Sequence, residues 1–516
     1  MAVEPVKVSK NDPEKVVLAG NASSIKDGDT HMHSAEYARF LELNHEFTGS
    51  RLRKLLRKCD FRVLPQLIIL YLMSYIDRTN VSNAKLFGIL QDLNLSSQQW
   101  NTCLSIFFVT YAFGGVPSNI ALKHFGPKIW LPALLTTVSL IQIAASVEIN
   151  YAGWAAFRVL LGLAEAGVFP GCSFVLTSWY SPAEVGARMG FFYSGASAAG
   201  AFSGLLAYGI GQLDHTWGYR GWRFIYCIEG LFSLCLSIAA FFFVYDTPAT
   251  VTWLSAEEKE FLILRQKFST GGDTGIAEKE NFSWKHARAA FRSPHIYALA
   301  VTEFTLCVTV YGYSFVLPTI INNLGYSAAN AQAMSVPPYV FACAVTALSG
   351  WLADKWQKRM LPLFLCNTMA LIGFIIMVVS VRYPGIPGVT LLGVFLTTGG
   401  LYPISPLATA WMSLNCAGSM KRAVGIGAMI SFSQLGGIMG SNIYIGSTAP
   451  KYPLGFGLSI AMLGLFGCIW PPVYALILKR INAKRAAIPE EDIRAKYTAD
   501  ELAEMGDESP LFRYSF

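Results

Sequence analysis

Four charged residues lie inside long apolar stretches of the sequence, where a charge is unfavourable unless it has a partner or a function. Asp77 and Arg78 are adjacent in "YIDRTNV", and Arg158 and Glu165 stand seven residues apart in "RVLLGLAEAGVFPG". On a helix seven residues make two turns, so Arg158 and Glu165 would share one face. A charge at the centre of a lipid-facing helix costs roughly 2.5–3.5 kcal/mol on the insertion scale. We therefore expect the two acids and two bases to converge on a cavity inside the protein.

Together, these residue types can exchange a proton for an anion at one place. A carboxylate in a partly dehydrated cavity can hold a proton near neutral pH. An arginine stays cationic and offers a planar fork that matches a carboxylate. An ionised acid would pair with the arginine, and protonation of the acid would free the arginine for an anionic substrate. The alternative is that the charges only hold helices together through buried pairs.

The elements that must position these residues are membrane-spanning helices. Of 516 residues, 53% are hydrophobic and 14% are charged, whereas soluble proteins carry about 25% charged residues. The apolar residues form blocks of roughly twenty, the length that crosses a bilayer core. The ten cysteines show no metal-ligand spacing, so neither a metal nor another cofactor is expected. The net charge of +7 is spread over loops that flank the spans, so nucleic acid is not an expected partner.

The sequence predicts an all-α polytopic membrane protein with twelve transmembrane helices in two six-helix bundles. The predicted spans are 62–82, 99–122, 129–149, 152–178, 189–211, 223–245, 295–321, 328–352, 360–381, 386–412, 424–446 and 455–478. The corresponding regions are an N-terminal tail with a basic juxtamembrane stretch (1–60), a first bundle (61–245), a linker (246–293), a second bundle (294–478) and a C-terminal tail (479–516). The tail up to about residue 50 is expected to lack regular structure, and the basic stretch suits an anionic lipid surface.

Lysine and arginine set the expected orientation. They are concentrated in both tails, in the linker and in the loops on the same side, and are sparse in the opposite loops. Because cytosolic loops carry this excess, we expect both termini and the linker to be cytosolic.

The two halves of the chain carry matching features. The loop "NIALKHFGPK" (119–128) and the loop "GWLADKWQKR" (350–359) share a pattern of apolar and charged residues at an offset of 231. Gly200 and Gly204 in the fifth span match Gly436 and Gly440 in the eleventh, and each pair suits close helix packing. An internal duplication of this kind is typical of two-bundle transporters with a central site.

Several motifs resemble one transporter family. "GWLADKWQKR" resembles the signature G-x-x-x-D-R-x-G-R-R of the major facilitator superfamily, with Gln357 in place of the second glycine. "YIDRTNVSNAK", "RVLLGLAEAGVFPG", "GWRFIYCIEG" and "YSFVLPTII" resemble its anion:cation symporter branch. "TPATVTWLSAEEK", "TAWMSLNCAGSMKRA" and the terminal "FRYSF" resemble fungal allantoate permeases, which are relatives of nicotinate, pantothenate and biotin transporters. The resemblance runs from about residue 52 to the end and implies proton-coupled transport of a small organic anion.

The resemblance also implies roles for the charged residues. In related symporters, the acids that match Asp77 and Glu165 are the proton sites, and the arginines that match Arg78 and Arg158 serve coupling and anion binding. One departure is "GGVPSN", where Gly115 stands in place of the usual acid of the second span. Coupling details are therefore expected to differ from those of better-known members.

The second half supplies further candidates. An inner gate is expected from the charged residues of its signature-like loop, which are Asp354, Lys355 and Arg359. Hydrogen bonds to a substrate could come from Tyr311, Tyr313, Gln434 and Asn442 in spans seven and eleven. The alternative for these four is packing or contact between helices.

The main functional prediction is a secondary active transporter, not an enzyme, that takes up a small organic anion with protons. Its transport unit is expected to be monomeric and to lie in the plasma membrane of a fungal cell. One alternative is export of an acidic metabolite, and a less favoured one is a nutrient sensor without transport. No catalytic constellation and no nucleotide-binding Gly-Lys-Ser/Thr loop occurs in the sequence.

Overall fold

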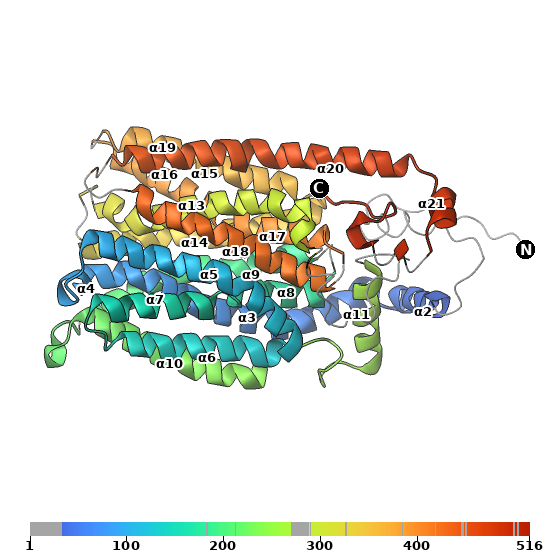
Figure 1. The fold of residues 1–516 in the computed structure, drawn as a ribbon, viewed down its shortest axis with the longest axis horizontal. Helices are drawn as coiled ribbons and strands as arrows, with labels where there is room; N and C mark the ends of the chain where they lie inside the picture. Colours follow the sequence, from blue (N-terminus) through green and yellow to red (C-terminus); the bar gives the residue numbers. More distant parts are fainter. Residues whose placement is uncertain are drawn as a thin grey trace, which may run out of the picture.

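The architecture is helical and elongated. The computed structural model describes residues 33–516 except for 182–183, 212, 270–287, 289, 323, 326–327, 384, 418, 445–447, 449–450, 499–500 and 503–504. These described residues form helices, turns and loops but no strand. Long helices lie side by side along the longest axis of the molecule (Figure 1).

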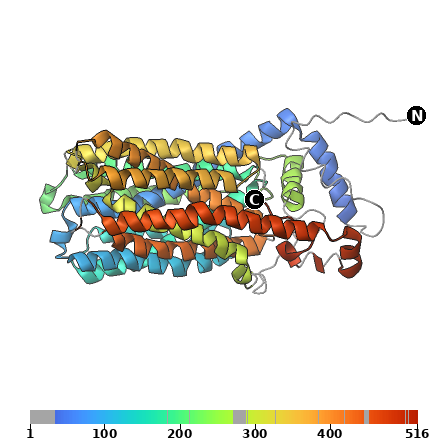
Figure 2. The same ribbon diagram turned by 90° about the horizontal axis from the view of Figure 1, so that it is seen from above.

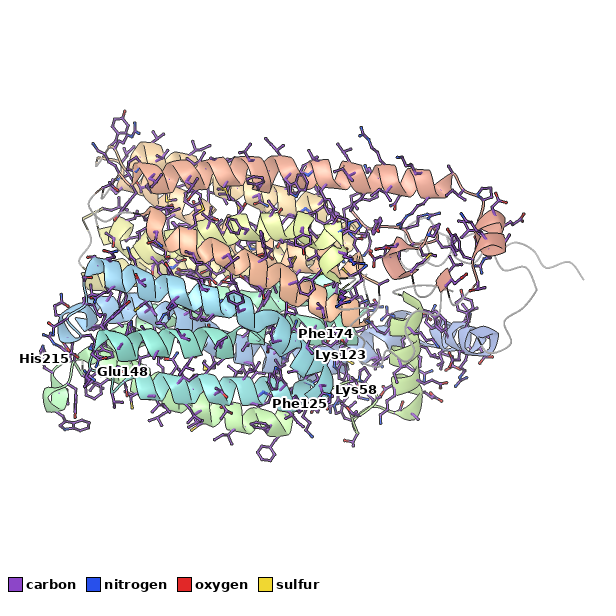
Figure 3. All side chains as sticks on the ribbon, in the orientation of Figure 1. Lys58, Lys123, Phe125, Glu148, Phe174 and His215 are labelled. Carbon is purple, nitrogen blue, oxygen red and sulfur yellow. The ribbon has the colours of Figure 1, made fainter. Side chains whose placement is uncertain are left out.

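The two ends of the helix bundle differ. One end, which we call the tail end, carries α2 (His33–Glu46), α11 (Ala256–Ser269), α21 (Glu490–Lys496) and the C-terminus (Figures 1 and 2). The opposite end, which we call the far end, carries the short helices α4 (Ile89–Asp92) and η1 (Thr216–Gly218). Figure 3 shows Lys58 and Lys123 toward the tail end, and Glu148 and His215 at the far end.

The spans follow the predicted order in each half. The first six are α3 (Gly49–Leu86), α5 (Ser97–Phe125), α6 (Pro127–Ala145), α7 with α8 (Tyr151–Glu165 and Val168–Trp179), α9 (Val185–Gly211) and α10 (Gly221–Phe243). The second six are α13 (Pro294–Asn322), α14 (Ala328–Trp356), α15 (Met360–Ser380), α16 with α17 (Pro387–Leu401 and Ile404–Leu414), α18 (Ser419–Ile443) and α19 with η4 and α20 (Pro453–Met462, Leu463–Ile469 and Trp470–Ala486).

Eleven helices in the described part of the chain are long and apolar enough to cross a membrane. The remaining predicted span, 189–211, is helix α9, in which glycine, alanine and serine dilute the hydropathy. These small residues have a packing role, because a Cβ on Gly190 would lie 2.8 Å from the carbonyl oxygen of Thr346 and 3.1 Å from Cα of Gly350. The backbones of α9 and α14 therefore touch. The protein is a multi-pass membrane protein, as its sequence predicts.

Helix packing repeats between the two halves. In the first half α3 packs on α9, α5 on α7, and α6 on α10. The corresponding helices of the second half pack in the same way: α13 on α18, α14 on α16, and α15 on the last span. The halves meet through α9 against α14 and through α5 against α18, which are again equivalent pairs. The packing thus reflects the duplication that the two loops indicate.

The predicted small-residue pairs have different outcomes. A Cβ on Gly436 or on Gly440 would lie 2.5 Å from a carbonyl oxygen of α13, so this pair allows the expected close contact. Gly200 faces the ring of Tyr339, 2.8 Å from its ideal Cβ, but Gly204 has no heavy atom within 4 Å. The packing role predicted for Gly204 is therefore wrong, because this glycine borders a cavity instead.

The N-terminal tail and linker are more ordered than the sequence suggests. The composition predicts a tail without regular structure to about residue 50, but α2 begins at His33. Phe47 of this region stacks on Phe261 of α11, with ring centroids 4.6 Å apart. Basic residues near the start of α3 form ion pairs with α11. The pairs are Arg51–Glu257 at 2.9 Å and Lys58–Glu258 at 2.7 Å. Arg51 and Lys58 are thus engaged by acidic side chains of the linker, whereas the sequence predicts that this basic stretch faces anionic lipid.

The C-terminal residues dock on the second bundle. The backbone N–H of Ser515 donates to Oδ1 of Asn415 (2.8 Å), and the indole N–H of Trp411 donates to the carbonyl of Ser515 (2.8 Å). Tyr514 lies over the ring of His295, with centroids 4.3 Å apart, and burial raises the pKa of its hydroxyl to about 12. Nearby, Lys421 and Asp507 form an ion pair at 2.6 Å. The last residues are therefore held against α13, α17 and α20.

Candidate functional site

Arg78 links the two bundles at the middle of the molecule. Its Nε donates to Oε2 of Glu165 at 2.9 Å, and its Nη1 donates to the hydroxyl of Tyr311 at 2.9 Å. Ser74, one turn before Arg78 on α3, donates to the other oxygen of Glu165 at 3.1 Å. Both charged side chains are buried, with 7% and 0% of their surface exposed. One arginine thus holds an acid of the first half and a phenol of the second.

The fourth span is interrupted directly after Glu165. Helix α7 ends at this residue, and α8 begins at Val168 after a short turn. Gly167 in the turn is pressed against α5, because a Cβ there would lie 1.7 Å from Oγ of Ser118. The tenth span is interrupted at the equivalent place, between Leu401 and Ile404. The sequence predicts neither break, since both spans read as continuous apolar stretches.

Arg158 lies two turns from Glu165, as its spacing predicts. Its Nε donates to the backbone carbonyl of Cys103 at 3.2 Å, and its guanidinium lies 4.4 Å from the ring centroid of Phe107. Nη1 of Arg158 and Nη2 of Arg78 are buried and have no hydrogen-bond partner in the described part of the chain. A buried donor without a partner is costly, so both atoms are suited to receive a ligand.

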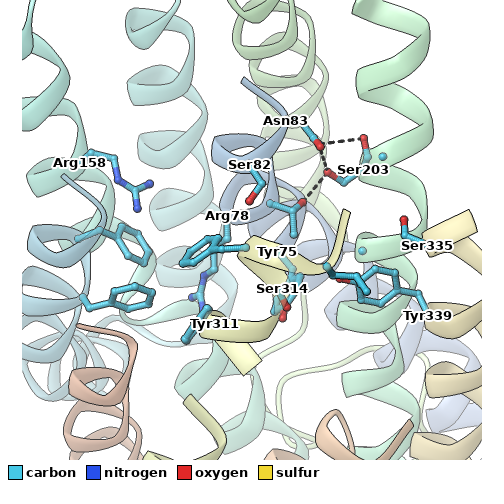
Figure 4. Close-up of a pocket in the computed structure, with 17 residues that line it drawn as sticks. Tyr75, Arg78, Ser82, Asn83, Arg158, Ser203, Tyr311, Ser314, Ser335 and Tyr339 are labelled. Atoms are coloured by element: carbon cyan, nitrogen blue, oxygen red, sulfur yellow. Dashed lines mark hydrogen bonds between the residues drawn. The ribbon is translucent and has the colours of Figure 1, made fainter. Parts of the chain in front are cut away.

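A cavity of about 70 Å³ lies beside both arginines, between the two bundles (Figure 4). By the same measure a single water needs about 10–15 Å³, so the cavity has room for several waters. Its aromatic and polar walls come from both halves: Tyr75, Phe107, Phe108, Ser203, Tyr311, Ser314, Phe315, Ser335 and Tyr339. Its charged lining residues are the two arginines, without an acid. The cavity is therefore electropositive and partly aromatic.

A second, smaller cavity of about 20 Å³ lies on the other side of the Arg78 layer. Tyr75, Arg78 and Tyr311 line both cavities and separate them. The second cavity is bordered by Gln434 and by Glu303, an acid of α13 that sequence reasoning missed. The signal was available, because Glu303 is an acid within an apolar span, just as Glu165 is.

Asp77 does not reach the inter-bundle cavities. Its carboxylate is fully buried inside the first bundle, beside Gln142 of α6. The expectation that two acids and two bases converge on one cavity is therefore wrong for Asp77, and Glu165 meets the cavities only through its bond to Arg78. Adjacent residues on a helix point about 100° apart, so Asp77 and Arg78 cannot both face the second half.

The four weaker candidates divide into two groups. Tyr311 and Gln434 border cavities, as described above. Tyr313 instead bonds to Thr398 at 3.0 Å inside the second bundle. Asn442 is exposed and donates to Ser105 at 3.0 Å. The alternative of helix-to-helix contact is thus the better description of Tyr313 and Asn442.

Two of the three residues predicted for a gate, Asp354 and Arg359, make contacts at the tail end. Asp354 of α14 accepts hydrogen bonds from the backbone N–H groups of Gly186 and Ala187, at 3.0 and 2.6 Å, in the first turn of α9. An anion is stabilised at a helix N-terminus by the free N–H groups and the helix dipole. Arg359 pairs with the same carboxylate at 2.5 Å. Lys355 is exposed and lies over the ring of Trp351, so it does not take part.

The first half contributes different contacts to the tail-end closure. Nδ2 of Asn119, at the end of α5, donates to the carbonyl of Ala423 on α18 at 2.9 Å. Arg422 donates to the carbonyl of Thr177 on α8 at 3.3 Å. Gly115, which replaces the usual acid, faces α18 so closely that a Cβ would lie 2.2 Å from Oγ of Ser431. A side chain at this position would require the Ser431 hydroxyl to turn away.

Comparisons with known proteins agree with this architecture. A sequence model of the Major Facilitator Superfamily matches residues 67–441. The MFS-type transporter cnsO of Penicillium expansum is 40% identical over 488 residues, covering 93% of this chain and 94% of that protein. A high-affinity nicotinic acid transporter of Saccharomyces cerevisiae is 29% identical and covers 90% of this chain and 85% of that protein.

The fold agrees with solved structures of the same superfamily. The proton:xylose symporter XylE matches with a TM-score of 0.58 and 14% identity over 79% of this chain and 94% of that chain. Two packed six-helix halves, a central site between them and the sequence matches lead to one conclusion. This chain belongs to the Major Facilitator Superfamily and is a membrane transporter, not an enzyme.

Proposed function

We propose that this transporter couples the movement of protons to the uptake of a small organic anion. The observation that carries the proposal is the 2.9 Å ion pair between Arg78 and Glu165 at the wall of an electropositive cavity. An arginine that faces a cavity and is held by an acid can change partner when the acid is neutralised. The same pair in a solid protein core would have no such alternative partner.

The first step of the cycle is competition for the Arg78 guanidinium. While Glu165 is ionised, it holds Arg78 and lowers the attraction of that arginine for an anion. When a proton binds to Glu165, the ion pair is lost and the Arg78 fork becomes available to a substrate carboxylate. The free Nη1 of Arg158 adds a second donor from the same side. Proton and anion therefore bind together more readily than either binds alone.

The second step is the passage from one side of the membrane to the other. In this structure the tail end is closed, because α8 packs on α18 and α17 packs on α9. Tyr311 belongs to the second half, so a substrate that displaces it from Arg78 changes a contact between the halves. We propose that this exchange allows the halves to rock, opening the tail end and closing the far end.

The nature of the substrate follows from the cavity walls. Two arginines favour a carboxylate, and the rings of Phe107, Phe108 and Tyr339 favour a planar or apolar body. A relative that transports nicotinic acid is in line with a small aromatic acid. Pantothenate, allantoate and biotin remain in the same class. We place the activity at the plasma membrane of a fungal cell, with a monomer as the transport unit.

The test is uptake of labelled acids by a transport-deficient yeast that expresses this protein. The panel contains nicotinate, pantothenate, allantoate, biotin and a sugar acid, each measured at pH 5 and pH 7.5 with and without a protonophore. We expect uptake of one acid to be faster at pH 5 and to collapse with the protonophore. Uptake that is the same at both pH values and unaffected by the protonophore would contradict proton coupling. No uptake of any acid, with the protein shown at the cell surface, would favour export or sensing instead.

A further inference from the structure

Glu303 is a buried acid of the second half that the cycle above does not use. The residue is 3% exposed, and it borders the second cavity together with Ser405, Ser433 and Gln434. Ser405 and Thr409 of α17 approach its carboxylate. Its Oε1 is buried and makes no hydrogen bond in the described part of the chain. One oxygen of Glu303 is therefore left for a further partner.

The surroundings of Glu303 contain little positive charge. The titratable side chains of its cavity are Cys307 on the same helix, Tyr71, Tyr75 and Arg78 on α3, Tyr111 on α5, Tyr193 on α9, and Tyr311 on α13. Only Arg78 in this set is a cation, and it is engaged by Glu165. An ionised carboxylate without a paired cation is strongly disfavoured in a protein interior. A bound proton removes this cost.

Arg78 bonds to one acid and lines the cavity that a second acid borders. It lines the cavity that contains Glu303 while it bonds to Glu165, and its Nη2 has no partner among the described residues. Glu165 belongs to the first half and Glu303 to the second. An anion that moves from the first cavity toward the tail end must pass Arg78 and then meet Glu303. While Glu303 is neutral it leaves the Arg78 guanidinium to the anion, whereas an ionised Glu303 would compete with the anion for that guanidinium.

We propose that Glu303 is a second proton-carrying site, which acts on the release side of Arg78. This inference rests on the proposed function and adds a proton to each transport cycle. With the tail end open, the proton leaves a carboxyl oxygen of Glu303 for water. The resulting carboxylate then takes the Arg78 guanidinium and displaces the substrate carboxylate. Glu165 thus controls the binding of the anion, and Glu303 controls its release.

The transport test uses Glu303→Gln, which keeps the shape of the side chain but cannot release a proton. Purified protein in liposomes is given a fixed pH gradient, and the labelled nicotinate gradient at which net flux stops gives the proton-to-nicotinate ratio. We expect the ratio to fall by one in Glu303→Gln. Glu229→Gln is the matched control, because Glu229 is equally buried but bonds to Asn80 inside the first bundle. An unchanged ratio in Glu303→Gln would overturn the proposal.

A second measurement is independent of any substrate. Infrared spectra of the purified protein at pH 7 report the C=O band of protonated carboxyl groups, and we expect wild type to show a component that is missing in Glu303→Gln. Melting temperature and gel filtration check that the variant is folded. If wild type takes up no acid in the panel, the proposed function fails while the infrared band still decides the state of Glu303. A spectrum that is the same in both proteins would contradict a proton on Glu303.

Discussion

Arg78 is placed where the protonation of Glu165 and the binding of an anion can both change its partners. Its fork is divided between the carboxylate of Glu165 and the phenol of Tyr311, and its face lies 4.7 Å from the ring centroid of Tyr111. Planarity is essential for all three contacts. A lysine at this position would keep the charge but could not form the same set.

We therefore expect Arg78→Lys to weaken substrate binding by about ten- to a hundredfold. The reason is the loss of a charge-assisted hydrogen bond, which is worth about 1.5–3 kcal/mol, at about 1.4 kcal/mol per factor of ten. The measurement is the KM for the transported acid in yeast. Lys355→Gln serves as the control, because Lys355 is exposed and far from the cavity lining. A wild-type KM in Arg78→Lys would argue against recognition by a planar fork.

Glu165→Gln should separate exchange from accumulation. The amide cannot ionise, so Arg78 stays available to the anion and no proton is needed to release it. We expect preloaded cells to exchange labelled for unlabelled substrate at a rate near that of wild type. Net accumulation driven by a pH gradient should be lost. Accumulation that persists in this variant would remove Glu165 from the coupling step.

The sequence predicts the central residues better than the peripheral ones. The spacing of Arg158 and Glu165 places them on one face, and burial of charge is sufficient to single them out. Asp77 carries the same signal, but the direction of its side chain depends on the rotation of α3 against α6. Tyr313 and Asn442 are polar residues in spans, and only the three-dimensional packing separates such residues from those that line a cavity.

At the level of helices, glycine positions determine where two helix backbones can come into contact. Gly190 of α9 meets backbone atoms of α14, which cannot move aside as a side-chain end can. Gly209 of the same helix has no heavy atom within 4 Å of its ideal Cβ. The two positions therefore form a matched pair on one helix.

We expect Gly190→Val to destabilise the contact between the halves, by about 1–3 kcal/mol for a well-packed site that receives extra atoms. Gly209→Val should leave stability unchanged or slightly higher, because valine disfavours helix less than glycine does. Melting of both variants in detergent, followed by tryptophan fluorescence, makes the comparison. Equal melting temperatures would show that the backbones of α9 and α14 do not touch at Gly190.

The contact between α3 and α11 should depend on pH. Partial burial opposes the charge of Glu258, but hydrogen bonds from Lys58 and from the backbone of Ser255 outweigh it and lower the pKa of this side chain. A lowered pKa in the folded state means that the contact stabilises above the ordinary value of about 4.3 and is lost as the pH falls through the lowered value.

Wild type should therefore melt at a higher temperature than Glu258→Gln at pH 7, and the difference should vanish as the pH falls below about 4. The effect is small, roughly 1 kcal/mol or less, because the pair is partly exposed. Glu257→Gln is the comparison, because Glu257 also pairs with Arg51 of α3 but its side chain is 57% exposed, so its difference should be smaller. A difference that grows on acidification would contradict a lowered pKa of Glu258.

Element boundaries show where sequence reasoning stops. Twelve spans follow from the length and apolarity of their segments, and the matching loops indicate the duplication. The breaks after Glu165 and after Leu401 do not follow from hydropathy. The signal for them is proline, because Pro170 and Pro406 cannot donate helix hydrogen bonds to Ala166 and Tyr402. The order of α2 and α11 does not follow either, since Phe47 and Phe261 bury each other across more than two hundred residues of chain.

For the whole molecule, charge predicts the orientation in the membrane. Basic residues gather at the tail end, and from this bias we expect both termini to be cytosolic. Epitope tags at either terminus should then be detected only after the cells are permeabilised. A tag inserted near His215, an exposed residue at the far end, should be detected on intact cells. The reverse pattern would mean that the orientation is opposite and that the uptake cycle runs the other way.

The two docked ends of the chain can each report the position of one half of the molecule. Helices α2 and α11 are tied to the first half, for example through Arg265 and Glu184 at 2.9 Å. The C-terminal peptide is tied to the second half through Asn415 and Trp411. If the tail end opens by separation of the halves, each docked end travels with its own half. The distance between a donor dye on Phe516 and an acceptor dye on α2 would then report the opening of the tail end. Each transport cycle could be followed in a single molecule without a label in the substrate path.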